Sequence, residues 1–409
     1  MRIITPEHLA AHLAAGGSPP RIVASGNHGT PWRLLEAVDK AIPAYRLFML
    51  GAQSGVPVRA GVVHESPFVG PGVRGLPSLR YLPARLSLVP RILASTHRPD
   101  VVLLHVAPPR DGLLSLGIEV DILPAAIEQC RARGGLVIAQ INPHMPYTYG
   151  DAQIPPEQVD LAIEAEEPLA GPATRTADDA SRFEQIGGRV AAMVSHGASL
   201  QAGIGAVPDA VLAALCGHRG LRIWSEMISD GVLGLERSGA LDPSANLNAS
   251  FLFGSPELYT WVHGNPRLRM LRTEVVNDPS RISTQPAMTS INTALQVDLY
   301  AQANASYVRS RIHSGFGGQS DFVVGALHSP GGQAIIALPA WHAKTDSSTI
   351  VGRLADPATS FQHTAVVTEV GRADLFGLCQ REQAANLIEH AAGPEAREHL
   401  RAQARGFGL

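Results

Sequence analysis

The chain has 409 residues, 45% of them hydrophobic and 17% charged, which is the composition of a soluble globular protein with more than one hydrophobic core. A formal net charge of −3 gives no electrostatic reason to expect nucleic acid or an anionic membrane as a partner. The N-terminus lacks the apolar run of a signal peptide, and no stretch approaches the roughly 18 apolar residues of a membrane span, so we expect a cytoplasmic protein.

Residues 1–170 alternate short apolar runs with helical patterns. Strands are predicted at 21–25, 45–50, 100–107 and 135–141, and a helix at 122–132. This spacing is typical of a parallel α/β layer, whose ligands lie beyond the carboxyl ends of the strands. The loops 108–117 and 142–151, the second of which begins at Asn142, are therefore candidates for a binding edge, although Asn-Pro and Gly-Asp are also ordinary turn dipeptides.

A polar stretch at 171–180 predicts a linker, followed by a helix over 179–194 with Asp178 or Asp179 as its N-cap. Gly203 and Gly205 then precede a helix that carries Pro208 in its first turn. Two glycines resemble part of a dinucleotide fingerprint, but proline occupies the position of the third glycine, so the pattern is weak evidence for NAD.

The stretch 291–340 carries the most chemical information. Alternating apolar residues up to Leu299 predict a strand, and the apolar run 334–339 predicts a buried one. Between them, Gly315, Gly317 and Gly318 allow a backbone whose N–H groups can converge on an oxyanion. The plainer alternative is that these glycines only form a turn.

Other chemistries lack their signatures. Cys130, Cys216 and Cys379 are isolated, which predicts neither disulfides nor a zinc site. The sequence contains no His-Glu-x-x-His pair, no Gly-x-x-x-x-Gly-Lys-Ser/Thr phosphate loop and no Gly-x-Ser-x-Gly elbow. We therefore expect no metal. His313 and His342, which flank the glycine stretch, are candidate bases, but a lone histidine is more often structural.

Six separated segments resemble, in order, those of the acetyl-CoA hydrolase/CoA-transferase family. They are "GLLSLGIEVD" at 112–121, "NPHMPYTYGD" at 142–151, "LQAGIGAVPDAV" at 200–211, "EMISDG" at 226–231, "NTALQVD" at 292–298 with "GFGGQSDF" at 315–322, and "TEVGRADLFG" at 368–377. The chain departs from the family pattern at Trp224, where histidine is common, and at Gln296, where the family motif has glutamate.

The resemblance implies an α/β fold of two tandem Rossmann-like CoA-transferase domains, with the active-site cleft between them. The implied ranges are 1–175 for the N-terminal domain and 176–409 for the C-terminal domain of the acetyl-CoA hydrolase type. It also implies a homodimer with acyl-CoA and a small carboxylate as substrates, and no permanently bound cofactor. The residues implied in catalysis are Gln296, Gly317, Gly318, Gln319 and Glu226, and those in CoA binding are Gly203, Gly205, Gly315, Asn142, Gly331 and Gly332.

Position 296 leaves three interpretations open. The family's nucleophile is a glutamate carboxylate, and the resemblance places it at this position, whereas an amide is not ionised and is a poor nucleophile. In the first, another group performs the chemistry of a CoA-ester hydrolase or transferase. In the second, the chain is a binding or regulatory protein that keeps the acyl-CoA cleft without turnover. In the third, the chain is an active transferase in which Gln296 was introduced in place of glutamate to trap a complex, or deamidates. We favour the first. Glu226 and Glu369 both follow predicted strands, and each either faces a cleft or holds a loop through backbone N–H groups.

Overall fold

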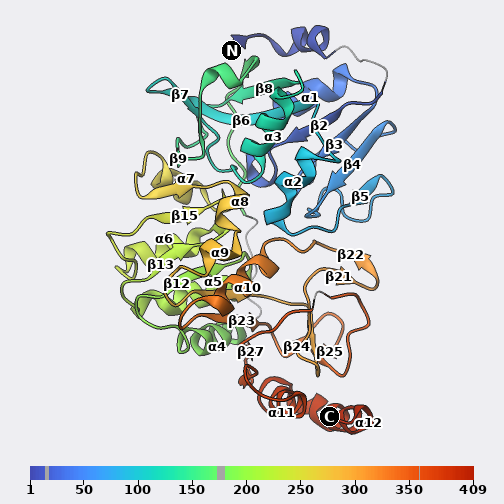
Figure 1. Ribbon diagram of the computed structural model, residues 1–409, viewed down its shortest axis with the longest axis vertical. Helices are drawn as coiled ribbons and strands as arrows, with labels where there is room; N and C mark the ends of the chain where they lie inside the picture. The colour runs from blue at the N-terminus through green and yellow to red at the C-terminus, as the bar shows by residue number, and fades with distance from the viewer. Residues whose placement is uncertain (14–17, 173–179, 359) are drawn as a thin grey trace. The chain divides into compact units, whose positions relative to one another are not determined.

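The computed structural model describes residues 1–13, 18–172, 180–358 and 360–409, which form two compact units (Figure 1). The first unit comprises 1–172, 246–276 and 312–317, and the second comprises 173–245, 277–311 and 318–409. Both units are discontinuous in sequence. The contiguous domain ranges 1–175 and 176–409 remain a proposal. The two units differ from these ranges because the first unit also contains 246–276 and 312–317.

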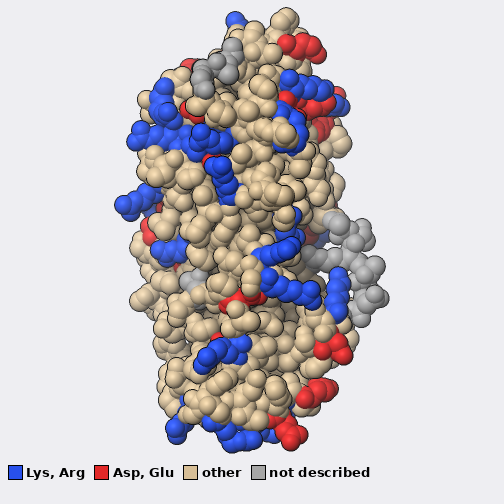
Figure 2. All heavy atoms as spheres, turned by 90° about the vertical axis from the view of Figure 1, so that its right-hand side faces the viewer, with Lys and Arg blue, Asp and Glu red and all other residues tan. Residues whose placement is uncertain are grey.

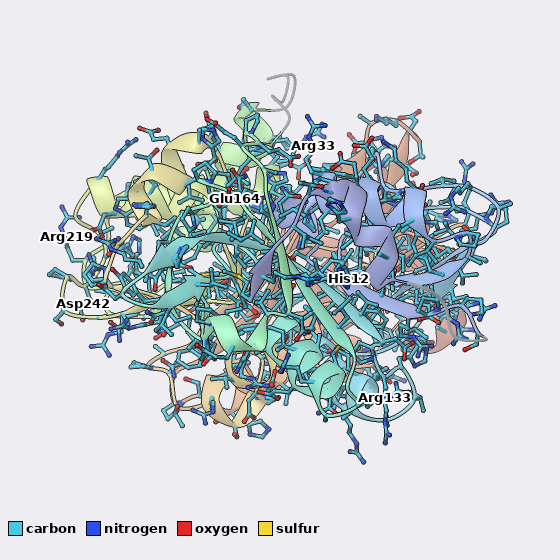
Figure 3. The ribbon with its side chains drawn as sticks, turned by 90° about the horizontal axis from the view of Figure 1, so that it is seen from above. His12, Arg33, Arg133, Glu164, Arg219 and Asp242 are labelled. Atoms are coloured by element: carbon cyan, nitrogen blue, oxygen red, sulfur yellow. The ribbon has the colours of Figure 1, made fainter. Side chains whose placement is uncertain are left out.

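The first unit is built on a parallel sheet with the strand order β1-β11-β8-β6-β2-β3-β4-β5. Its central strands are apolar on both faces because helices cover both, and Arg33 on α1 and Arg133 just after α3 extend from opposite sides (Figure 3). The chain runs outward from β2 to β3 and returns from β6 to β8, which places a topological switch point between β2 and β6.

The strands of the first unit are β1 (Arg2–Ile3), β2 (Arg21–Ala24), β3 (Tyr45–Phe48), β4 (Val62–Ser66), β5 (Leu79–Tyr81), β6 (Val101–Arg110), β7 (Leu113–Ser115), β8 (Leu136–Ile141), β9 (Tyr149–Gly150), β10 (Gln153–Ile154), β11 (Leu161–Glu164), β15 (Leu247–Ala249), β16 (Phe251–Leu252) and β17 (Leu268–Met270). Its α-helices are α1 (Trp32–Ala41), α2 (Val89–Ala94), α3 (Leu123–Arg131), α7 (Pro256–Val262) and α8 (Thr273–Val276). Short 3-10 turns are η1 (Pro6–His12), η2 (Asn27–Gly29), η3 (Leu86–Leu88) and η4 (Pro156–Gln158).

The second unit contains a sheet with the order β28-β27-β23-β18-β12-β13, parallel except for the β27–β28 pair. From β12 the chain runs to β13 on one side, and later returns to β18 and β23 on the other. Its switch point therefore lies between β12 and β18. A small sheet of order β20-β19-β26 and the hairpin β24–β25 complete its β structure, and α11 and α12 form the C-terminal tail.

The strands of the second unit are β12 (Ser199–Ala202), β13 (Arg222–Trp224), β14 (Met227–Ile228), β18 (Thr289–Asn292), β19 (Gln296–Asp298), β20 (Ala303–Asn304), β21 (Tyr307–Val308), β23 (Gln333–Ala337), β24 (Trp341–His342), β25 (Ser347–Ser348), β26 (Ile350–Val351), β27 (Ala365–Val367) and β28 (Arg372–Asp374). Strand β22 (Arg311–Ile312) begins in this unit. The helices are α4 (Ala180–Ala191), α5 (Ala206–Ala214), α6 (Asp230–Arg237), α9 (Pro279–Ile282), α10 (Gln319–His328), α11 (Gln380–Asn386) and α12 (Pro394–Phe407), with a 3-10 turn η5 (Leu215–Gly217) and a π-helical turn η6 (Leu387–Ala391).

The predicted α/β class is confirmed, and the strands expected at 21–25, 45–50, 100–107, 135–141 and 334–339 all form. The strand expected around Val297 is confirmed as β19, while the residues before it form β18 of the main sheet. Val297 and Leu299 are buried in a core that β19 shares with Ile336 of β23. Both residues proposed as the N-cap, Asp178 and Asp179, lie outside the described residues.

On the face seen in Figure 2, both acidic and basic side chains are present, and large uncharged areas lie among them. Within the described ranges, each helix is too short or too polar to cross a lipid bilayer.

The buried ion pair of Arg21 and Glu65 joins β2 to β4 of the first sheet. Arg21 Nε and Nη2 donate to the two carboxylate oxygens at 2.6 and 3.2 Å, and both residues are at most 9% exposed. We expect Glu65→Ala to lower the free energy of unfolding by about 3–5 kcal/mol, since it leaves a buried guanidinium without its carboxylate. Denaturant titration measures this change.

The control is Glu36→Ala, which removes the solvent-exposed partner of Lys40 on α1 and should change stability little. Equal effects of the two substitutions would show that the Arg21–Glu65 pair is not part of the stable core.

Candidate active site

Glu226 lies at the carboxyl edge of the second unit's sheet. It follows β13 by two residues, and the intervening Ser225 ties this turn to the end of β12, since its Oγ donates to the carbonyl oxygen of Ala202 at 3.3 Å. Ligands of open parallel sheets bind beyond this edge, so the sheet places the Glu226 carboxylate where a substrate would lie.

The Glu226 carboxylate packs directly on the backbone of Gly318. A Cβ atom added to Gly318 would lie 1.7 Å from Glu226 Oε2 and 2.3 Å from Asn277 Nδ2. Asn277 is fully buried, and its Nδ2 donates to Glu226 Oε2 at 3.0 Å. Glycine is therefore required at 318 because any side chain would displace the carboxylate, and the three residues form one contact group.

Hydrogen-bond donors surround this group. Gly318 is the residue before α10, whose first-turn N–H groups have no intrahelical acceptors and carry the positive end of the helix dipole. The next residue, Gln319, has a buried side-chain Nε2 that finds no acceptor among the described residues. An anion forming beside Glu226 would meet the Asn277 amide and these donors.

The preceding glycines need their special conformations. Gly315 and Gly317 have φ values of +155° and +55°, which L side chains rarely adopt. In the first unit, a Cβ on Gly315 would lie 2.5 Å from the Pro67 carbonyl oxygen, and one on Gly317 would lie 3.1 Å from the Phe68 ring. The glycine stretch is thus more than a simple turn, because neighbouring atoms leave no room for a side chain at Gly315, Gly317 or Gly318.

Gln296 lies on β19, where its Cα is paired with that of Asn304, and it is half-buried. Among the residues that the structure describes, none makes a hydrogen bond to its side-chain amide. The assignment of position 296 to the nucleophile stays a prediction, whereas the carboxylate found in contact with the glycine stretch belongs to Glu226.

The other residues predicted at the site have varied surroundings. Gly203 has open space where a side chain would be, and Gly205, with φ +131°, immediately precedes α5. Gly331, with φ +72°, and Gly332, whose Cβ would lie 2.0 Å from the Ala326 carbonyl oxygen, form the tight turn between α10 and β23. The contacts of these glycines with CoA stay predictions.

Two predicted polar residues organise loops. Asn142 is buried, and its side-chain amide nitrogen donates to the Glu167 carbonyl oxygen at 2.7 Å and contacts His105 Nε2 at 3.0 Å. Glu369 accepts the Ala340 N–H at 2.8 Å and pairs with Arg182 at 3.4 Å, which is the loop-holding alternative considered for it.

Three polar residues of the second unit were not predicted as parts of the site. Gln201 and Ser290 are buried at the switch point between β12 and β18, and Ser290 Oγ donates to Gln201 Oε1 at 2.6 Å. Asn277 was overlooked because Asn-Asp-Pro is a common helix-start signature, and Asp278 does cap α9.

The two histidines considered as candidate bases have different surroundings. Burial lowers the pKa of His313, and His342 lies on the exposed hairpin strand β24. In the described parts of the chain, no three His, Cys, Asp or Glu side chains come together to hold a metal ion.

Two family models match the chain. Residues 60–170 match the acetyl-CoA hydrolase/transferase N-terminal domain, and residues 254–404 match the C-terminal domain of the same family. A 4-hydroxybutyrate coenzyme A transferase from Clostridium kluyveri is 35% identical over 98% of this chain and 96% of its own length. The chain belongs to the acetyl-CoA hydrolase/transferase family. Members are hydrolases or transferases that act on CoA thioesters, so the chain is an enzyme of that class.

Solved structures agree with this family assignment. RipA from Yersinia pestis is 28% identical, with a TM-score of 0.90 over 100% of this chain and 98% of that one. A 4-hydroxybutyrate CoA-transferase from Porphyromonas gingivalis is 27% identical, with a TM-score of 0.81 over 99% of this chain and 98% of that one. The tandem α/β fold that the resemblance implied is therefore confirmed.

Gly318→Ala should lower the free energy of unfolding by about 1–3 kcal/mol, because the new methyl group overlaps Glu226 and Asn277. The matched control is Gly234→Ala in α6, where a Cβ meets open space. That substitution should raise stability by about 0.4–1 kcal/mol through the unfolded state. Chemical denaturation of both variants measures the difference, and a stabilising Gly318→Ala would contradict the contact.

Proposed function

We propose that this enzyme transfers CoA from an acyl-CoA thioester to a carboxylate, and that Glu226 is its nucleophile. The contact that carries the proposal is the Glu226 carboxylate held against Gly318 by Asn277. A nucleophile and the donors for its oxyanion must lie within a few ångströms of one another, and this group meets that requirement inside one unit.

In the first step, one oxygen of the Glu226 carboxylate attacks the thioester carbonyl carbon. The carbonyl π electrons move to its oxygen, and the resulting oxyanion is stabilised by donors such as Asn277 Nδ2 and the N–H groups at the start of α10. As the carbonyl re-forms, the C–S bond breaks and CoA leaves as a thiolate, so that the acyl group is left as a mixed anhydride on Glu226.

In the second step, the CoA thiolate attacks the Glu226 carbon of the anhydride. The acyl group leaves as a free carboxylate, and CoA is held as a thioester on Glu226. A second carboxylate then repeats the two steps in reverse, receives CoA and regenerates the Glu226 carboxylate. No proton needs to be gained or lost overall, which suits a site built from a carboxylate and neutral donors.

Under this proposal, the amide of Gln296 is compatible with CoA-transfer activity. Carboxylates are ionised at neutral pH, whereas an amide is a poor nucleophile, so loss of glutamate at 296 would stop the reaction only if that position were the nucleophile. We keep Gln296, Gln319, Gly203 and Gly205 as candidate substrate contacts. A homodimer is also part of the proposal and rests on the family resemblance, and a cytoplasmic location is carried over as an expectation from the sequence.

Glu226→Gln should lower kcat for CoA transfer to acetate by about 10³-fold or more, since it removes the attacking carboxylate while keeping the side chain's size. Gln296→Glu should leave kcat within about tenfold, because the carboxylate is already supplied. Steady-state assays over a panel of acyl-CoA donors, with and without acetate, measure both. If Glu226→Gln keeps its activity, or if Gln296→Glu becomes much more active, the nucleophile is a residue other than Glu226. Cleavage of acyl-CoA that does not depend on acetate would indicate a hydrolase.

CoA or acetyl-CoA should raise the melting temperature of the full chain. A ligand that binds only the folded state at 100 times its Kd adds about 2.7 kcal/mol of stability. NAD at the same concentration should cause no shift, because Pro208 replaces the third glycine of the dinucleotide fingerprint. A shift with NAD and none with any CoA ester would contradict the proposed substrate class.

A further inference from the structure

A pocket of about 410 Å³ lies at the carboxyl edge of the first unit's sheet. Its walls come from three segments of that unit, which are the loop after β8, the chain beyond β11 and helix α7. The volume is within the range of small-molecule sites in proteins, and the carboxyl edge of a parallel sheet is where such sites form. The catalytic residues proposed above all belong to the second unit, so they give this pocket no role.

The walls of the pocket are apolar and firmly held. Four of the lining residues are prolines, which are Pro143, Pro146, Pro168 and Pro256. The ring of each fixes its φ angle, so these walls have little conformational freedom. Tyr259 forms another side, and its hydroxyl lies 2.9 Å from His28 Nδ1 and donates to the Ala170 carbonyl oxygen at 3.3 Å. The pocket is therefore formed before a ligand arrives, which lowers the cost of binding.

His263 supplies a hydrogen-bond donor to the pocket. It follows α7 directly, and its Nδ1 accepts the Tyr147 N–H at 3.2 Å. In a neutral imidazole the second nitrogen then carries the proton, so His263 Nε2 is a donor. A second imidazole, that of His144, also lines the pocket, and its Nε2 lies 3.4 Å from Glu166 Oε1.

The charges around the pocket favour an anion. Among the described residues that line it, none is acidic, and the nearby Glu166 already has His144 as its partner. The Arg110 guanidinium lies beside the residue that follows His263, since a Cβ on Gly264 would be 3.2 Å from Arg110 Nη1. Arg110 packs over the Tyr147 ring and, within the described ranges, makes no ion pair with a carboxylate.

We propose that this pocket binds a small aromatic carboxylate. The ring lies between the prolines and Tyr259, and the carboxylate accepts a hydrogen bond from His263 Nε2. A flat ring buries a large apolar area at little cost in conformational entropy, and a charged acceptor strengthens the hydrogen bond. The proposal does not depend on Glu226 as the nucleophile, because the pocket lies wholly in the first unit.

Photoaffinity labelling of the full wild-type chain with 4-azidobenzoate tests where the ligand binds. Irradiation should attach the probe to peptides that contain residues 143–146, 168–169 or 256–263, and excess benzoate should prevent this labelling. Labelling of these peptides that benzoate does not prevent would overturn the proposal, as would labelling confined to other parts of the chain.

Thr260→Trp should fill the pocket, because Thr260 lines it and is exposed on α7. The Kd of 4-fluorobenzoate, measured by ¹⁹F NMR titration, should rise by about tenfold or more as the ring loses its space. The matched control is Thr96→Trp, which adds the same bulk at an exposed threonine of the first unit that does not line the pocket. Its Kd should match that of wild type. Equal Kd values for Thr260→Trp and wild type would show that the carboxylate binds elsewhere.

His263→Phe separates the contribution of the charge from that of the ring. It keeps an aromatic side chain but removes the Nε2 donor, so it should weaken 4-fluorobenzoate binding by about tenfold. Binding of 4-fluorobenzamide, which has the ring without the charge, should be weaker than that of 4-fluorobenzoate in wild type and unchanged by the substitution. Equal affinities of wild type for the two probes would overturn the assignment of an anionic ligand.

Discussion

The Glu226 carboxylate held between Gly318 and Asn277 is the contact on which this account of the enzyme depends. It joins three segments that are far apart in sequence, and each makes a specific demand. Position 318 must lack a side chain, Asn277 must present an amide donor, and β13 must end where a carboxylate can reach both. The contact brings an anionic nucleophile and neutral donors into one place, which is the combination that acyl transfer needs.

The parallel sheet of the second unit explains why these segments meet. Its parallel strands end at one edge, and the connection between strands changes direction between β12 and β18, so the loops on either side of this point diverge and leave room. Buried amide and hydroxyl groups of Gln201 and Ser290 satisfy one another beneath it, which keeps the edge rigid without adding charge. Glu369 serves the neighbouring turn in a similar way, because it accepts the Ala340 N–H.

Much of the fold could be predicted from sequence because its signals are local. Apolar runs such as 100–107 and 334–339 are long enough to predict buried strands, and the three glycines of 315–318 indicate close backbone approach. The alternation of Val297 and Leu299 likewise predicts a strand with these two side chains buried, and β19 forms there. Periodicity predicts that a side chain is buried, but it does not predict which strands pair with this one.

The site was harder to predict because its contacts are not local. The glycine stretch and the motif around Gln296 are close in sequence, which favoured a nucleophile at 296, yet the carboxylate in contact with Gly318 comes from a distant turn. Asn277 was also missed, because the Asn-Asp-Pro sequence is typical of a helix start and gives no sign of a contact with Glu226.

Chemical trapping of the covalent intermediate tests the central claim most directly. The full chain is incubated with acyl-CoA, treated with borohydride, digested and analysed by mass spectrometry, since borohydride reduces a glutamyl thioester to an alcohol. The account predicts that the reduced residue is Glu226 and that Gln296 is unmodified. An adduct on any other residue, or turnover of acyl-CoA to a carboxylate acceptor with Glu226 unmodified, would contradict it.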